Sequence, residues 1–180
     1  SLCNTSFHYK FFVDSIIKFD YHKYGEIISF TLGQIGESKR SESFLLNKLS
    51  DSSNNFQIPT FIAIGKVGDS TTLEFLFQSI DSNIILNSDG FPYAIVDFFS
   101  RGIKNEKSNK YLEKKLTTYS NEEGLFQTLF TLYRIGPTKE LIPALERILS
   151  KNLNQQTTLY MLGNFRKLKW NVRNQIRKLQ

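Results

Sequence analysis

The sequence has few of the residues that form disulfides, bind metals or act as catalytic bases. It contains one cysteine, Cys3, so an internal disulfide is excluded, and its two histidines, His8 and His22, stand apart from other ligand types. No HExxH, CxxC or His-Glu motif occurs, which argues against a metal site built from histidine and cysteine. We therefore expect no metal, no cofactor and no catalytic activity.

Long apolar runs are also missing, so the sequence predicts no membrane-spanning helix and no membrane partner. Its 180 residues, 40% of them hydrophobic and 22% charged, are typical of a soluble globular domain. The single cysteine is compatible with a reducing compartment. From these features we expect one domain over 1–180, in a cytoplasmic and monomeric protein.

What the sequence does contain is a recurring pattern of two glycines around an aliphatic residue. Leu32-Gly33-Gln34-Ile35-Gly36 returns as Ile64-Gly65-Lys66-Val67-Gly68, and weaker copies end at positions 102, 136 and 166. The last positions are therefore 32, 34, 34 and 30 residues apart. A spacing this regular indicates an array of structural repeats.

Each copy predicts a helix that ends at its last position, which is glycine in the first four copies and Arg166 in the degenerate fifth. Apolar residues stand four positions before that end (Leu32, Ile64, Phe98, Leu132, Leu162) and six positions before it (Phe30, Ile62, Val96, Phe130, Tyr160). We expect both sets to belong to a wide apolar face. The last glycine suits a left-handed helix end, and the earlier one suits close contact between helices.

A second helix is predicted after each glycine turn. Thr71 and Glu74 have the spacing of a capping box at one such start. A single helix pair cannot bury its own apolar faces, so neighbouring pairs must stack. We expect Ile84–Leu86 to pack against this stack, because it is too apolar for a free loop. The predicted repeats lie near 20–52, 53–85, 88–119, 120–152 and 153–180, with 1–19 as a partial repeat or N-terminal cap.

These residues resemble HEAT repeats, of the short type found in phycobilin-lyase-related proteins. The best-fitting stretches are 33–37, 65–69 and 135–143, whereas Arg101 departs from the pattern. The resemblance implies an all-α fold, a right-handed α-α superhelix (α-solenoid) of about five helical hairpins. It also implies a non-catalytic protein-binding scaffold whose second helices line a concave surface. No residue supports bilin attachment, and the lack of His-Glu motifs separates the chain from deoxyhypusine hydroxylase, a HEAT-like metalloenzyme.

Charge is distributed unevenly along the chain. Residues 1–90 hold 7 Lys/Arg and 10 Asp/Glu, a net charge of −3, whereas 91–180 hold 16 and 7, a net charge of +9. Nine basic residues recur at helical spacing and are the candidate binding ridge: Lys107, Lys110, Lys114, Arg147, Lys151, Arg166, Lys169, Arg173 and Arg177. Such a ridge suits a protein or peptide partner with acidic segments. A solvated face that keeps the array soluble explains the same residues.

A nucleic-acid-binding protein is the alternative function. Some alkylpurine DNA glycosylases resemble HEAT arrays, and a basic ridge also suits phosphates. Such an enzyme needs aromatic and acidic side chains in the basic groove, for which Trp170, Tyr133 and Asp97 are the candidates. Two acidic pairs, Asp14 with Asp20 and Glu122 with Glu123, have acid–base chemistry as one interpretation and ordinary helix-end carboxylates as the other.

Overall fold

The computed structural model describes residues 3–36, 38–116 and 122–136, and every regular element in these ranges is an α-helix. The fold class is therefore all-α, as the sequence predicted. The helices are α1 (Cys3–Ile16), α2 (Tyr21–Ile35), α3 (Lys39–Ser50), α4 (Gln57–Val67), α5 (Ser70–Asp81), α6 (Phe91–Ser100), α7 (Lys107–Leu116) and α8 (Glu122–Ile135).

Contacts divide the chain into two compact units, Ser1–Asn105 with α1 to α6 and Glu106–Gln180 with α7 and α8. The helix pair α2 and α3 falls in the predicted window 20–52, and α4 and α5 fall in 53–85. That these pairs are repeats of one domain over 1–180 stays a prediction. The last predicted window, 153–180, lies outside the described residues.

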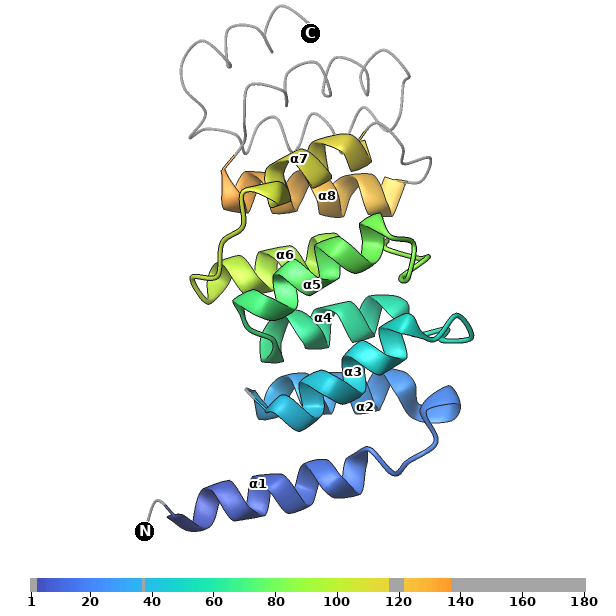
Figure 1. Ribbon diagram of the computed structural model, residues 1–180, viewed down its shortest axis with the longest axis vertical. Coiled ribbons are helices and arrows are strands. Elements are labelled where there is room, and N and C mark those ends of the chain that lie inside the picture. Colours follow the sequence, from blue (N-terminus) through green and yellow to red (C-terminus); the bar gives the residue numbers. More distant parts are fainter. Residues whose placement is uncertain (1–2, 37, 117–121, 137–180) are drawn as a thin grey trace, which may run out of the picture. The chain divides into compact units, whose positions relative to one another are not determined.

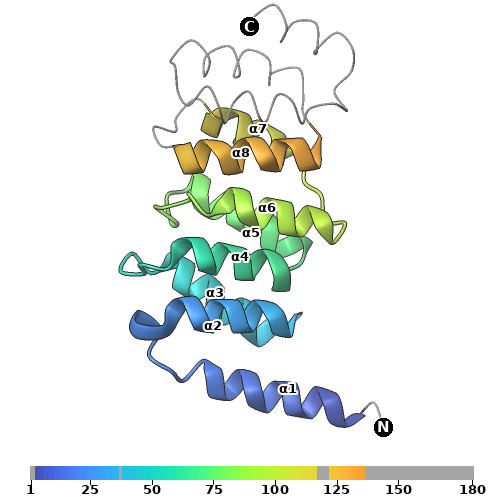
Figure 2. The same ribbon diagram turned by 180° about the vertical axis from the view of Figure 1, so that it is seen from behind.

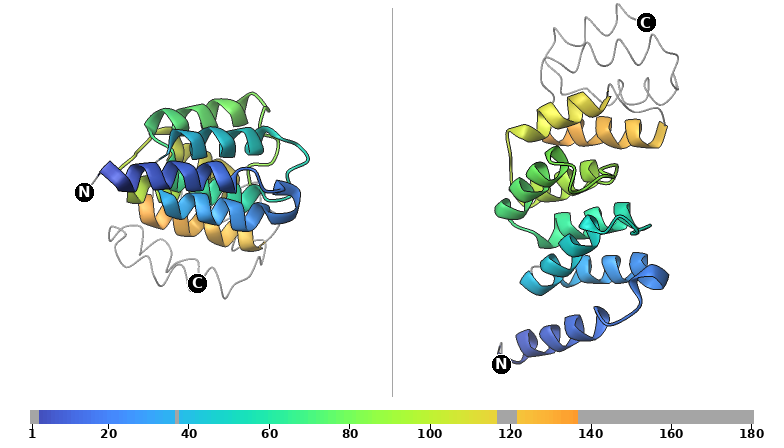
Figure 3. Two further views of the ribbon diagram at one scale, coloured as in Figure 1. Left: turned by 90° about the horizontal axis from the view of Figure 1, so that it is seen from below. Right: turned by 45° about the vertical axis from the view of Figure 1, so that its right-hand side comes forward.

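In the first unit the helices form two rows. α2 packs on α4 and α4 packs on α6, so the first helices of the hairpins contact one another in series (Figures 1 and 2). α3 and α5 lie together on the other side, as the left panel of Figure 3 shows along the row. In the second unit, α7 packs on α8, and the side-chain amide of Asn109 donates to the Gly136 carbonyl at 2.7 Å.

The core confirms one of the two predicted apolar positions. The residues four before the glycine, Leu32, Ile64, Phe98 and Leu132, are all fully buried at 0% exposure. The residues six before it are not, because Phe30 is 63% exposed and Phe130 is 37% exposed. The two positions are two residues apart, and such residues lie about 200° apart around the axis of an α-helix. A helix that buries the first position therefore turns the second outward. The prediction that both belong to one face was wrong.

Gly33 and Gly65, three residues before the terminal glycines of their repeats, lie where the first helices approach closely. A Cβ added to Gly65 would lie 2.8 Å from both the Cα and the carbonyl oxygen of Ala94 on α6. A Cβ on Gly33 would lie 3.3 Å from the Cα of Ala63 on α4. The expected use of this glycine, close contact between helices, is therefore confirmed at both positions. Small residues set the spacing of this row.

The glycines at the helix ends fall into two kinds. Gly36, Gly102 and Gly136 have φ of 85°, 83° and 100°, a region that side chains rarely adopt, as predicted. Gly68 differs, since its φ is −74°. Its lack of a side chain is explained by packing instead, because a Cβ there would lie 2.7 Å from Cγ2 of Thr72.

Arg101, which departs from the HEAT-like pattern, caps the preceding first helix. Its guanidinium donates to the carbonyl oxygen of Lys66 at 2.6 Å and to that of Gly68. It also lies over the ring of Phe98, 5.5 Å from the ring centre. The last carbonyls of an α-helix have no partner within the helix, and a cation at this end is favourable. Arg101 thus links the end of α4 to α6.

A polar cluster joins α3 to the start of α5. Lys39 Nζ lies 2.6 Å from Oδ2 of Asp69 and 2.8 Å from Oε2 of Glu42, and the hydroxyl of Thr72 donates to Glu42. Asp69 is the N-cap of α5 and forms a capping box with Thr72, so the predicted box of Thr71 and Glu74 was wrong. The hydrogen bond from Lys39 holds the pKa of Asp69 below its usual range.

Replacing Gly65 by alanine should destabilise the protein, whereas replacing Gly33 should not. Alanine gains about 1 kcal/mol of helix propensity over glycine at either site. At Gly65 the new Cβ meets backbone atoms that cannot turn away, and we expect a net loss of about 1–3 kcal/mol. At Gly33 the looser contact leaves the change within about 1 kcal/mol of zero. Urea unfolding followed by circular dichroism measures both, and equal effects would contradict this account.

The acid sensitivity of the fold should depend on Asp69. Its pKa is lower in the folded chain than in the unfolded one, so its contribution is present at neutral pH and is lost as the pH falls below about 4. Asp69→Asn keeps an N-cap oxygen but removes the charge. The stability difference between wild type and this variant should therefore shrink between about pH 5 and pH 2. Asp81→Asn is the control, because it removes a carboxylate at the far end of α5, away from Lys39.

Candidate functional site

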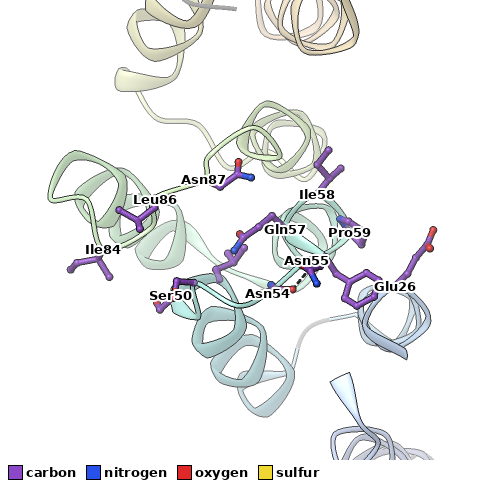
Figure 4. A pocket seen from close by; sticks show the side chains of 13 residues that line it. Glu26, Ser50, Asn54, Asn55, Gln57, Ile58, Pro59, Ile84, Leu86 and Asn87 are labelled. Atoms are coloured by element: carbon purple, nitrogen blue, oxygen red, sulfur yellow. Dashed lines mark hydrogen bonds between the residues drawn. The ribbon is translucent and has the colours of Figure 1, made fainter. Parts of the chain in front are cut away.

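A groove with a volume of about 540 Å³ runs along one edge of the first unit. We call it the loop-edge groove, because it lies where α3 ends, where α4 begins and where the α5–α6 loop passes (Figure 4). Glu26 of α2 stands at one end of it, and Ile84 and Leu86 stand at the other. It therefore reaches across three consecutive parts of the stack.

The α3–α4 loop, which forms one wall, is held by its own side chains. The Asp51 carboxylate accepts from the backbone N–H of Ser53 at 2.9 Å and from its hydroxyl at 2.6 Å, which lowers the pKa of Asp51. Asn54 is 6% exposed; its amide donates to the Lys48 carbonyl at 2.9 Å, and its oxygen accepts from Phe56 N at 2.7 Å. The wall is thus an ordered turn, where the sequence showed only a turn-rich linker.

A buried network around Thr60 fastens this wall to the first-helix row. The Thr60 hydroxyl donates to the Phe56 carbonyl at 2.5 Å and lies 2.6 Å from the hydroxyl of Tyr21, which lies 2.6 Å from that of Ser29. Asn54 also donates to Thr60, at 3.3 Å. Because Thr60 has one proton and gives it to Phe56, Tyr21 must donate to Thr60 and Ser29 to Tyr21. We call Tyr21, Ser29, Asn54 and Thr60 the hydroxyl network.

Two further features stabilise the hydroxyl network: the protonation of Tyr21 and the packing of Phe56. Burial raises the pKa of the Tyr21 phenol, so it stays a proton donor at neutral pH. Phe56 covers Gly25, where a Cβ would lie 2.3 Å from its ring, and its ring meets that of Tyr21 edge-on at 6.0 Å. The loop is therefore seated on α2 by an aromatic contact that only glycine permits.

The opposite wall comes from the α5–α6 loop. Asn83 has φ of 58°, and the N–H groups of Ile84 and Ile85 both donate to the Ser79 carbonyl. This turn buries Ile85 at 2% exposure but leaves Ile84 54% and Leu86 75% exposed. Packing of 84–86 against the stack was predicted, and it is confirmed for Ile85 alone. The other two side chains give the groove its apolar end.

Gln57, the first residue of α4, has the most unusual environment in the groove. It is 9% exposed, and its side-chain oxygen accepts no hydrogen bond from the part of the chain that the structure describes. Figure 4 shows its amide directed into the space between the two loops. No side chain caps the start of α4 either, since its N-cap residue is Phe56. Buried polar groups are usually satisfied, so this one needs an explanation.

The groove offers hydrogen-bonding and apolar groups. Among the described residues that line it, Glu26 carries a charge and none is lysine or arginine. The Ser50 hydroxyl donates to its own helix, at the Leu46 carbonyl, rather than to a base. Carboxamides and aliphatic side chains form most of the surface, and these give directed hydrogen bonds and apolar contact.

The predicted basic ridge is placed only in part. Lys107, Lys110 and Lys114 are exposed on α7 of the second unit, at the helical spacing that the sequence indicated. The other six residues lie outside the described ranges: Arg147, Lys151, Arg166, Lys169, Arg173 and Arg177. A role for the ridge in binding stays a prediction.

The residues considered for catalysis have separate places. Asp97 lies on α6 of the first unit, and Tyr133 lies on α8 of the second, whereas Trp170 is outside the described ranges. Burial raises the pKa of Asp97 against the nearby charges of Lys66 and Arg101. Asp14 pairs with Arg40 at 2.5 Å, and Asp20 caps α2, so each has a structural partner.

Among the described residues, no three His, Cys, Asp or Glu side chains gather as metal ligands would. None of the helices in 3–36, 38–116 and 122–136 combines the length and the apolar character that crossing a membrane requires.

Comparison with known proteins adds no relative. The sequence matches no protein-family model, and searches among curated proteins and among solved structures find no match. The site must therefore be interpreted from its own geometry. Sequence reasoning missed it, although four consecutive groove residues, Asn54 to Gln57, form a polar run that includes three carboxamides and ends at a helix start.

Thr60→Val should weaken both the fold and the wall of the groove. Valine has nearly the same shape but leaves the buried Tyr21 hydroxyl without its acceptor, and we expect a loss of about 1–3 kcal/mol. Thr31→Val is the matched control, because Thr31 donates only to the Ile27 carbonyl of its own helix; its effect should stay within about 0.5 kcal/mol. Denaturant unfolding measures both, and equal losses would show that the network contributes nothing.

Proposed function

We propose that this protein is a non-catalytic protein-binding scaffold: a short α-solenoid of HEAT-like helical hairpins that binds an extended polypeptide. The proposed contact surface is the loop-edge groove of the first unit, in place of the concave second-helix face that the family resemblance implies. The basic second unit is proposed to add an electrostatic contact to an acidic segment of the same partner.

The observation that supports this proposal best is the composition of the groove. It combines exposed aliphatic side chains, Ile84 and Leu86, with carboxamides at Asn55 and Gln57, and Glu26 is the charged group that lines it. An extended polypeptide offers apolar side chains and unpaired main-chain N–H and C=O groups, and these are the complements of such a lining. A small charged metabolite would leave the aliphatic end unused.

The row of first helices supports the proposal in a second way. Backbone-level contacts at Gly33 and Gly65 hold α2, α4 and α6 at fixed spacing, so loops on one edge are presented at regular intervals. In repeat proteins, the face on which the loops of successive repeats emerge is often the binding face.

Selection of peptides from a phage-displayed random library tests the proposal. The full chain should enrich a defined set of peptides whose synthetic versions bind by calorimetry with micromolar affinity. The variant Ile84→Glu/Leu86→Glu places two charges on the apolar end of the groove at exposed positions, and it should lose most of this binding without loss of stability.

The control variant is Phe30→Glu, since Phe30 is comparably exposed on α2 but does not line the groove. It should bind the selected peptides as wild type does. Failure to enrich any peptide, or enrichment that the groove variant leaves unchanged, would contradict the proposal. Binding of double-stranded DNA that weakens steeply with salt would instead favour the nucleic-acid alternative.

A further inference from the structure

We propose that the start of α4 is a recognition site for one residue of extended main chain, whose N–H and C=O groups point to the same side and are bound together. The inference rests on the proposed function and names the chemical groups of the partner that the loop-edge groove binds. The site consists of the Gln57 side chain and the first backbone N–H groups of α4. Nearby Ile84 and Leu86 then hold an aliphatic side chain of the same extended segment.

The side-chain oxygen of Gln57 is an acceptor without a donor. Gln57 is 9% exposed, so its carboxamide has left bulk water, yet its oxygen receives no hydrogen bond from the described residues. A buried polar atom without a partner costs stability. Tyr21, Ser29, Asn54 and Thr60 nearby are all satisfied, so the site is not merely poorly packed. A ligand that brings an N–H group would remove the deficit at Gln57.

The start of α4 also holds a pair of backbone donors without acceptors. The first N–H groups of an α-helix have no partner within it, and here no side chain caps them. Thr60 N already donates to the Phe56 carbonyl, and Pro59 has no N–H. The N–H groups of Gln57 and Ile58 therefore remain at the end of an 11-residue helix whose dipole favours an oxygen ligand.

Together these groups select one kind of ligand. A residue in extended main chain presents its C=O and its N–H on the same side, so it satisfies the helix N–H groups through the first and the Gln57 oxygen through the second. A carboxylate or phosphate would satisfy the helix but leave the Gln57 oxygen unmatched. The described lining residues include no lysine or arginine, which also disfavours an anion. The expected ligand is therefore an uncharged stretch of extended main chain with an aliphatic side chain.

A fragment titration followed by NMR tests the inference on the full chain. The probe is N-acetyl-leucine N-methylamide, with sodium acetate and inorganic phosphate as comparison probes. We expect saturable shifts of the Gln57 side-chain amide and of the Ile58 backbone amide with the blocked leucine, at millimolar Kd. Little change is expected with acetate or phosphate. Equal or larger shifts with either anion, or no shift at Gln57 with the peptide fragment, would overturn the inference.

The variant Gln57→Leu separates a binding role from a structural one. Leucine fills similar space and removes the unsatisfied oxygen, so the melting temperature should stay the same or rise while the fragment shifts at Ile58 weaken at least fivefold. A marked fall in melting temperature would show that Gln57 stabilises the fold, against the inference. Gln34→Leu, at an exposed glutamine of α2 outside the groove, is the control and should leave fragment binding unchanged.

The two proposals fail in different ways. Library peptides that depend on Leu86 but not on Gln57 would leave the scaffold function intact and remove the main-chain site. Fragment binding at Gln57 without any enriched peptide would leave the main-chain site intact and contradict the scaffold function. A peptide that passes both tests should lose affinity when the amide facing Gln57 is replaced by an ester, because the ester lacks the N–H that the Gln57 oxygen accepts.

Discussion

The closeness of the first helices is the constraint on which the rest of the first unit depends. α2, α4 and α6 approach until backbone meets backbone, with the missing side chain of Gly65 against Ala94 and that of Gly33 against Ala63. A spacing set by small residues cannot widen or narrow without a cavity or a clash. It therefore determines where each hairpin loop emerges, and the loop-edge groove exists because those loops emerge on one edge.

The hydroxyl network turns this spacing into a shaped surface. Thr60 lies on the first-helix row and contacts Tyr21 across to α2 and Asn54 in the loop, so one side chain connects three segments. Every group of this network has a partner, whereas Gln57, three residues before Thr60, does not. Most buried polar groups in natural proteins are satisfied, and the exceptions occur often at functional or strained sites. This contrast within one helical turn is the reason for placing the binding site at the start of α4.

Several details follow from residues whose partners are remote in sequence. Arg101 breaks the local pattern because its guanidinium serves the end of α4, more than thirty residues away. Gly68 fits the pattern of a left-handed helix end but is required by Thr72 instead. Ile84 and Ile85 are equally apolar, yet the turn at Asn83 buries only the second. In each case the deciding contact lies outside the window that a local pattern covers.

The sequence by itself determined the helical hairpins, the glycine at most of their ends and the buried position four residues earlier, because these depend on period and backbone conformation. Only the tertiary structure decided which face of each helix is open, which loop side chains line a groove and which buried amide lacks a partner. Those properties depend on neighbours brought together by stacking, and a residue such as Gln57 has no local feature that records them.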